Sequence, residues 1–221
     1  MNYLYILFED KNDEMFYHLC LEKLTGQTFN LSQKLYFAEG MAGVASVRSG
    51  LNRLLSDIQY MGTLENVFFL AAIDNDRSPC HPEHVRLPNL GKNDRRKECR
   101  FCEILTKIEE KFGQDWTKWP IRGAVVVPVE MLESWLLLIC GVKENESDLP
   151  LFAKKRSPSA IDYYKKPSNQ LKDLCRIQQR KLGLTKDEFY LHCVEQLNPD
   201  QLTQSSSSFA LFKQQVDHWF I

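Results

Sequence analysis

Two aspartates one residue apart, Asp74 and Asp76, directly follow an apolar run at residues 67–73. A short and continuous apolar run is typical of a buried strand in a parallel sheet. Open α/β sheets bind their ligands at the carboxyl ends of such strands. Carboxylate oxygens at this position are the ligands that Mg²⁺ and Mn²⁺ prefer. The alternative is an Asx-rich turn that only ends the strand.

Acidic residues also follow two other expected strands. Glu9 comes after the apolar run at 3–8, and Glu130 and Glu133 follow the expected strand at 124–127. Because the carboxyl ends of parallel strands meet at one edge of a sheet, these side chains can converge with the aspartate pair.

This set of carboxylates predicts a metal site for phosphodiester chemistry. A Glu with Asp-x-Asp can bind one or two divalent ions, which neutralise phosphate charge and lower the pKa of an attacking water. We expect Asp74 and Asp76 to hold Mg²⁺ or Mn²⁺ together with Glu9, which alternatively acts as the general acid or base. Glu133 is the first candidate for a further ligand with a catalytic role, and Glu130 is the second.

The elements that would position these residues alternate between strand and helix patterns. Strands are expected at 3–8, 34–38, 67–73 and 124–127, and a mostly buried helix at 131–140 with Glu130 and Glu133 in its first turn. Past residue 145 only helical patterns occur. The chain is therefore expected to form one α/β domain at 1–142, with a mostly parallel sheet flanked by helices, and a helical extension at 143–221 packed on it.

Signals for helix ends support this division. Thr185 followed by Glu188 forms a capping box, and Asn198-Pro199 can open another helix. The serine run at 205–208 is expected to cap the last helix.

The segment ILFEDKNDEMFYHLCLEKL, followed by FFLAAIDND, resembles a TOPRIM domain. This is the metal-dependent fold of topoisomerases, bacterial primases and OLD-type nucleases. The positions that match the family pattern are Glu9, Asp13, Phe16, Tyr17, Asp74 and Asp76. Asp10 stands where the family has Gly, and Asn12 where it has Thr. The resemblance implies the fold and a divalent metal.

Later segments are similar to a branch of small TOPRIM-like proteins associated with bacterial defence against phage. These segments are VPVEMLESWLLL, KKPSNQLKDL and SSSFALFKQQV. The Glu before Trp-Leu-Leu in that branch corresponds to Glu133 with Trp135, and its Ser-Phe near the tail corresponds to Ser208-Phe209. The resemblance implies a protein partner, for example an ATPase of the same defence system.

Residues 77–102 interrupt the periodic pattern and predict an inserted zinc-binding loop. Cysteine and histidine gather there in the order C-H-x2-H followed by C-x2-C, and the second half has the spacing of a zinc knuckle. Small segments without their own core often need such a metal. Coincidence among seven cysteines and five histidines is the alternative. The expected Zn²⁺ ligands are Cys80, His84, Cys99 and Cys102, with His81 as an alternate ligand.

Basic residues concentrate in two stretches although the net charge of the whole chain is −1. Residues 77–100 hold seven basic and three acidic residues, and 154–181 hold nine and two, giving +4 and +7. Basic residues interleaved with Tyr163 and Tyr164 suit a nucleic-acid surface, although a solvated face is the more general reason for a charge run. The expected contact residues are Lys11, Arg77, Arg95, Arg96, Lys97, Arg100, Lys154, Lys155, Arg156, Lys165 and Lys166.

The composition, 43% hydrophobic and 26% charged, is that of a globular protein and argues against disorder. No secretion signal or apolar run of membrane-spanning length is present, and cysteines without such a signal favour a reducing cytoplasm. We therefore expect a cytoplasmic Mg²⁺- or Mn²⁺-dependent nuclease acting on DNA or RNA. The alternatives are a degenerate TOPRIM-like module that binds nucleic acid or a partner, and phosphoryl or nucleotidyl chemistry on a small molecule.

Overall fold

A computed structural model describes residues 1–33, 36, 44–61, 66–75, 99–116, 122–150 and 167–220, and the chain divides into two compact units. Unit 1 comprises Met1–Ile73, Phe101–Val126 and Phe212–Ile221. Unit 2 comprises Asp74–Arg100 and Val127–Leu211. The chain therefore passes from one unit to the other four times.

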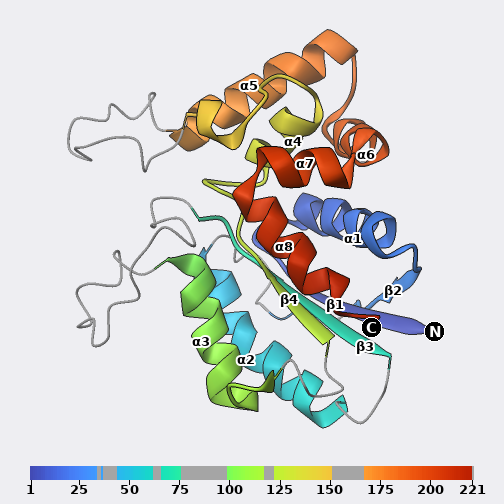
Figure 1. Ribbon diagram of the computed structural model, residues 1–221, viewed down its shortest axis with the longest axis vertical. Coiled ribbons are helices and arrows are strands. Elements are labelled where there is room, and N and C mark those ends of the chain that lie inside the picture. The colour runs from blue at the N-terminus through green and yellow to red at the C-terminus, as the bar shows by residue number, and fades with distance from the viewer. Residues whose placement is uncertain are drawn as a thin grey trace. The chain divides into compact units, whose positions relative to one another are not determined.

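Unit 1 is built on a four-stranded sheet whose strands all run parallel (Figure 1). The order is β2-β1-β3-β4. The strands are β1 (Asn2–Leu7), β2 (Phe29–Leu31), β3 (Val67–Ala72) and β4 (Arg122–Val126). All six residues of β3 are buried, which explains why its sequence is continuously apolar rather than alternating. The expected α/β class with a parallel sheet is confirmed.

Helices cover both faces of this sheet (Figure 1). One face carries α2 (Val44–Met61) and α3 (Arg100–Phe112), and the other carries α1 (Lys11–Thr25) and the second half of α8 (Ser207–Asp217). Arg48 of α2 donates two hydrogen bonds to the Glu103 carboxylate of α3, at 2.5 and 2.9 Å. A bidentate pair of this kind fixes the two helices against each other more firmly than a single contact.

The second half of α8 is bonded to β4, the outermost of the described strands on its side. The Gln215 amide accepts from the Val125 N–H at 2.9 Å and donates to the Val125 carbonyl at 3.0 Å. Trp219 Nε1 donates to the Gly123 carbonyl at 3.2 Å. Unit 1 thus satisfies backbone groups of β4 with side chains from the end of the described chain.

The described part of unit 2 is helical, and the described residues past 145 form helices only, as the sequence pattern predicts. It contains a short 3₁₀ helix at Glu146–Asp148, the first part of α8, and α4 (Glu133–Ile139), α5 (Pro167–Leu182), α6 (Lys186–Gln196) and α7 (Pro199–Ser205). The capping box is confirmed, since Glu188 accepts from the Thr185 N–H and hydroxyl at 2.7 Å each. These hydrogen bonds lower the pKa of Glu188. Asn198 caps α7, which begins with Pro199, also as predicted.

Some boundaries differ from those expected. The second strand is Phe29–Leu31, whereas the expected strand at 34–38 lies outside the described residues except for Tyr36, which is in a bend. Helix α3 begins at Arg100, so residues 100–102 are helical rather than part of a loop. Among the described helices, none is both long enough and apolar enough to cross a membrane.

Candidate metal centre

The strand order creates a topological switch point within unit 1. From β1 the chain continues to β2 on one side and later to β3 on the other side. In open α/β sheets, ligands bind outside the carboxyl ends of the two strands at such a point. The register aligns Leu7 with Ala71, so β1 and β3 end almost level. Glu9 follows β1 by two residues and is half-buried.

Asp74 follows β3 by two residues and is half-buried. Within unit 2, the Leu132 N–H donates to Asp74 Oδ1 at 3.2 Å. The neighbouring Asn75 is 3% exposed, and its N–H donates to the Pro128 carbonyl at 3.4 Å. The residues after β3 are therefore bonded to the residues after β4, and the bond from the Leu132 N–H orients the Asp74 carboxylate.

Glu130 differs from its prediction because it is not in a helix. Helix α4 begins three residues later, at Glu133. Glu130 has a φ of 65°, and it is the one non-glycine residue of the described chain with a positive φ. This left-handed conformation is incompatible with a right-handed helical turn and costs about 1–3 kcal/mol, so it persists only because surrounding contacts hold it. Glu130 is also buried, with 4% exposure.

Glu133 is the first residue of α4, in agreement with its expected place in a first turn, and it is half-buried. The Leu132 N–H that bonds Asp74 belongs to the residue just before it. The Cys175 thiol of α5 donates to the Glu133 carbonyl at 3.7 Å. Within unit 2, the start of α4 is thus held by two hydrogen bonds, one from Leu132 to Asp74 and one from Cys175 to Glu133.

A buried carboxylate that the sequence did not point to is Glu146. It is 7% exposed and accepts from the hydroxyls of Ser206 and Ser208 at 2.8 and 2.6 Å. It also accepts from the N–H and hydroxyl of Ser207 at 3.0 Å each. Buried carboxylates require such partners, and a helix N-terminus favours negative charge. The serine run therefore anchors Glu146 to the start of α8, in addition to its expected capping role, in which Ser206 Oγ accepts from the Phe209 N–H.

The Trp135 and Ser208-Phe209 motifs contact each other. Trp135 is fully buried and its Nε1 donates to Ser208 Oγ at 2.8 Å. Its ring meets the Phe209 ring edge-to-face, with centroids 5.1 Å apart. These two short motifs, 73 residues apart in sequence, form one packing unit.

Many predicted residues lie outside the described part of the chain. Cys99 and Cys102 are described, and both are buried, one just before α3 and the other in its first turn; Arg100 between them is half-buried. Lys11 begins α1, but its side chain is not described. The residues outside are Asp76, Arg77, Cys80, His81, His84, Arg95, Arg96, Lys97, Lys154, Lys155, Arg156, Lys165 and Lys166.

The donor chemistry fits a hard divalent cation. Oxygen ligands from carboxylates at strand ends are those that Mg²⁺ takes, usually with only one or two protein carboxylates. Within the described ranges, which omit Asp76, no group of three or more His, Cys, Asp or Glu side chains is arranged to hold a metal ion. The chain matches no protein-family model, no curated protein and no solved structure. Function is therefore inferred from the sheet topology and the acidic residues themselves.

Proposed function

We propose that this chain is a TOPRIM-like, divalent-metal-dependent nuclease that cleaves phosphodiester bonds of DNA or RNA as an effector of bacterial defence against phage. The observation that carries the proposal is that Asp74 comes two residues after β3, a strand at the switch point of a parallel sheet. It follows β3, next to β1, after which Glu9 comes. This is where the physics of open α/β sheets favours a ligand site.

In the proposed site, Asp74 and Asp76 hold Mg²⁺ or Mn²⁺ together with Glu9. Glu133 is the first candidate for a further ligand, and Glu130 is the second. The bound ion supplies neutralisation of phosphate charge and a more acidic attacking water. The hydrogen bond from the Leu132 N–H restricts how the Asp74 carboxylate can turn, which is the usual task of groups around a metal ligand. If Glu9 does not ligate, its carboxylate accepts or returns the proton of the attacking water. The cysteine and histidine loop, with Zn²⁺, is a proposed structural addition.

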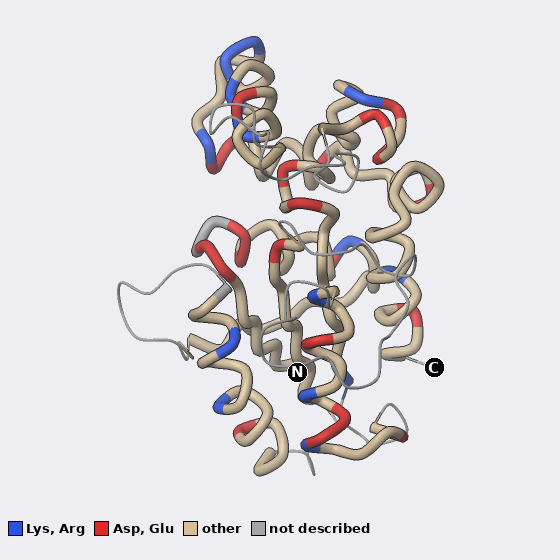
Figure 2. Tube along the Cα trace, turned by 90° about the vertical axis from the view of Figure 1, so that its left-hand side faces the viewer, with Lys and Arg blue, Asp and Glu red and all other residues tan. Residues whose placement is uncertain are grey.

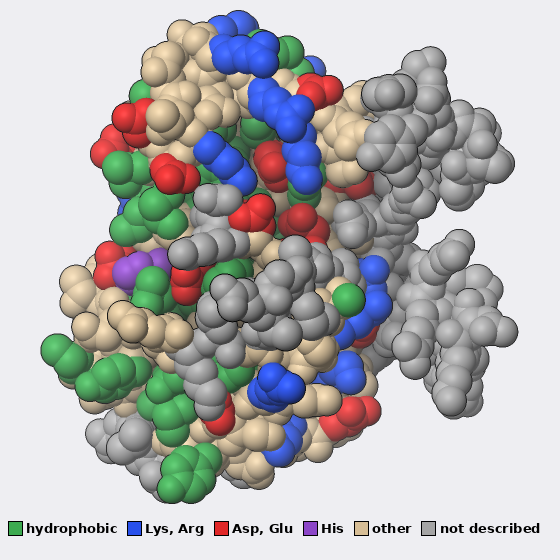
Figure 3. All heavy atoms as spheres, turned by 180° about the vertical axis from the view of Figure 1, so that it is seen from behind, with side chains coloured by type: hydrophobic (Ala, Val, Ile, Leu, Met, Phe, Trp, Pro, Cys, Tyr) green, Lys and Arg blue, Asp and Glu red, His purple; other side chains and the backbone are tan. Residues whose placement is uncertain are grey.

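The exposed face of α5 supports a nucleic-acid substrate. Lys172, Arg176 and Arg180 recur every four residues on this helix and all are exposed. Figure 3 shows a row of basic side chains over α5, and Figure 2 shows Lys and Arg positions along the same part of the backbone. Residues four apart on a helix are separated by about 6 Å along its axis. The row can therefore follow the phosphate backbone of a nucleic acid. A polyanion held by such a row would bind in a salt-dependent manner.

Replacing Lys172 and Arg180 by alanine is expected to weaken binding of nucleic acid about tenfold near 0.1 M salt, because two phosphate contacts are lost. The slope of log affinity against log salt is expected to fall by roughly 1.4–1.8. Fluorescence anisotropy with labelled DNA and RNA in EDTA measures both quantities without cleavage.

The matched control removes the same charge elsewhere. Lys23→Ala with Lys111→Ala changes two exposed basic residues on α1 and α3. This double variant is expected to bind as the unmodified protein does. Equal weakening by both double variants would show a general charge effect and contradict a binding role for α5.

A catalytically degenerate module that binds nucleic acid or a partner is the second candidate. Asp10 favours it, because a side chain stands where the family pattern has Gly and can obstruct a phosphate at that turn. The Asp10 carbonyl accepts from the Asp13 N–H at 2.9 Å, so this residue forms the turn into α1.

Incubation of the purified protein with end-labelled single- and double-stranded DNA and RNA tests the proposal. The reactions contain Mg²⁺, Mn²⁺ or EDTA. Cleavage with either metal that stops in EDTA is the expected result. Salt-dependent binding without cleavage in any reaction would instead favour the degenerate module.

A further inference from the structure

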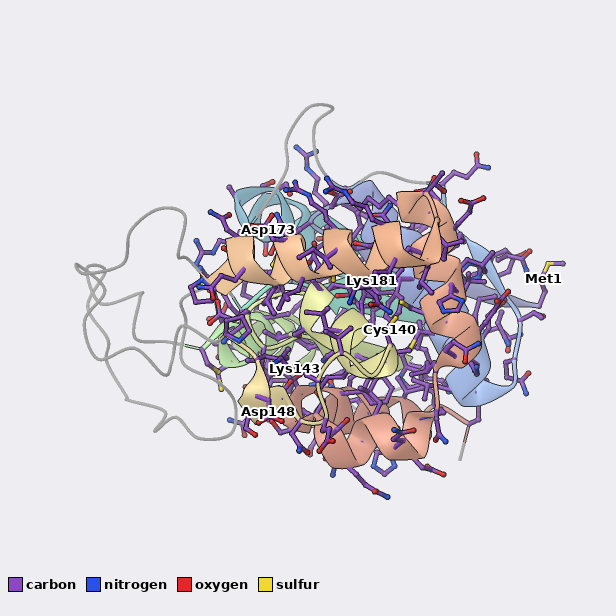
Figure 4. All side chains as sticks on the ribbon, turned by 90° about the horizontal axis from the view of Figure 1, so that it is seen from above. Met1, Cys140, Lys143, Asp148, Asp173 and Lys181 are labelled. Carbon is purple, nitrogen blue, oxygen red and sulfur yellow. The ribbon has the colours of Figure 1, made fainter. Side chains whose placement is uncertain are left out.

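Three cysteines lie together in unit 2, on three different helices. Cys140 caps the C-terminal end of α4, Cys175 is in α5 and Cys193 is in α6. The Sγ atoms of Cys140 and Cys193 are 3.3 Å apart (Figure 4 labels Cys140). A disulfide bond requires about 2.05 Å, so the two sulfurs need to approach by only about 1.2 Å. None of the six cysteines in the described chain is in a disulfide.

The two thiols of this pair differ in reactivity. Cys140 is half-buried, whereas Cys193 is fully buried. The hydrogen bond from the Cys193 thiol lowers the pKa of Cys140. The same hydrogen bond, together with burial, raises the pKa of Cys193. Since a peroxide must reach the sulfur and Cys140 is the more exposed of the two, we expect Cys140 to react first.

We propose that Cys140 and Cys193 are a reversible oxidation site, at which a peroxide converts the thiol pair to an intramolecular disulfide. In the first step the Cys140 thiolate attacks one oxygen of hydrogen peroxide, which leaves Cys140 as a sulfenic acid and releases hydroxide. In the second step the Cys193 sulfur attacks the sulfenic sulfur, and water leaves with the Cys193 proton. Two electrons pass from the thiol pair to the peroxide, and a dithiol reductant reverses the reaction by thiol–disulfide exchange.

The third thiol is a poor competitor for the same partner. Cys175 is 7% exposed, and its thiol donates to the Glu133 carbonyl instead. Its burial leaves little of the Cys175 thiol accessible to a peroxide. In unit 1, Cys20 is fully buried and burial raises its pKa to about 12, which makes it equally unreactive.

The disulfide would connect the end of α4 to α6 across 53 residues of sequence. Helix α4 begins at Glu133, so the link would restrain the helix that carries this proposed ligand. Transient disulfides in reducing compartments are typically redox sensors or catalysts. The inference goes beyond the proposed nuclease function and does not depend on it.

The test uses the full chain, reduced and then exposed to hydrogen peroxide, after which the chain is unfolded in guanidinium chloride with EDTA and the remaining thiols are alkylated. We expect the number of alkylated thiols to fall from seven to five, and peptide mass spectrometry to identify a Cys140–Cys193 link. The melting temperature should rise by roughly 5 °C or more on oxidation and return with dithiothreitol, because the link restricts the unfolded chain.

Two variants in the same cluster serve as a matched pair. Cys175→Ser should still form the link, whereas Cys140→Ser should keep all of its remaining thiols. A link to Cys175, disulfides between chains, or irreversible oxidation of Cys140 in the unmodified protein would overturn the proposal. These outcomes are read on the unmodified chain, so the conclusion does not require that either variant fold.

Discussion

Replacement of Asp74 and Asp76 together by asparagine is expected to lower the rate of Mg²⁺- or Mn²⁺-dependent cleavage by about 10³-fold. Removing the charge of both proposed ligands withdraws several kcal/mol of transition-state stabilisation that the ion supplies, and 1.36 kcal/mol corresponds to a tenfold change in rate. Asparagine retains an oxygen that can accept from the Leu132 N–H, so the local structure should survive. The measurement is single-turnover cleavage of labelled DNA and RNA.

A control with the same change in charge is Asp187→Asn with Asp200→Asn, at exposed positions in the first turns of α6 and α7. It should cleave at the unmodified rate. Circular dichroism of both double variants checks that they are folded. Metal-dependent cleavage that survives in a folded Asp74→Asn/Asp76→Asn protein would exclude these aspartates as the metal ligands.

The Gly123→Ala variant is expected to lose about 1–3 kcal/mol of the free energy of unfolding, the usual cost of overpacking a core. The fully buried Phe69 ring of β3 lies directly against the Cα of Gly123, its partner in β4, and a Cβ there would overlap the ring. The ring must move inside a packed core, which also disturbs its contact with Trp116, 6.0 Å away between centroids. The total free energy of unfolding of a typical domain is only about 5–15 kcal/mol, so urea denaturation will resolve the loss easily.

Gly141→Ala provides the comparison. Gly141 has a φ of 65° and open space around its missing Cβ, so alanine there should cost only about 1 kcal/mol of backbone strain. Combining Gly123→Ala with Phe69→Leu should recover part of the loss, because the smaller side chain makes room. An equal effect of the two glycine variants, or no recovery in the combination, would mean that the Phe69 contact does not determine the requirement for glycine.

The strands that could be predicted from sequence are those whose apolar runs are long enough to stand out. β3 buries all six of its residues and β4 buries four of five, while β1 buries three of six. β2 has three residues, of which Phe29 is buried and Asn30 is exposed, and it exists because it pairs with β1. A segment this short carries no periodic signal, so its position depends on tertiary contacts.

The same distinction applies to the candidate site. The positions of Glu9 and Asp74 after strands follow from local patterns, because a charged residue ends a buried apolar run. The left-handed backbone of Glu130 has no local signal, since glutamate rarely adopts it. The burial of Glu146 depends on serines about 60 residues later in the chain. Contacts over such distances are fixed by packing, which a single sequence does not display.

The four passages of the chain between the units have a consequence for protein synthesis. All four strands of the sheet have left the ribosome before α8 is made, yet the Val125 backbone groups bond a side chain that is translated 90 residues later. Domains usually fold in the order of their synthesis. Here β4 is translated long before the residues that complete its hydrogen bonds, so the nascent chain carries an incompletely covered β4 until Gln215 and Trp219 emerge.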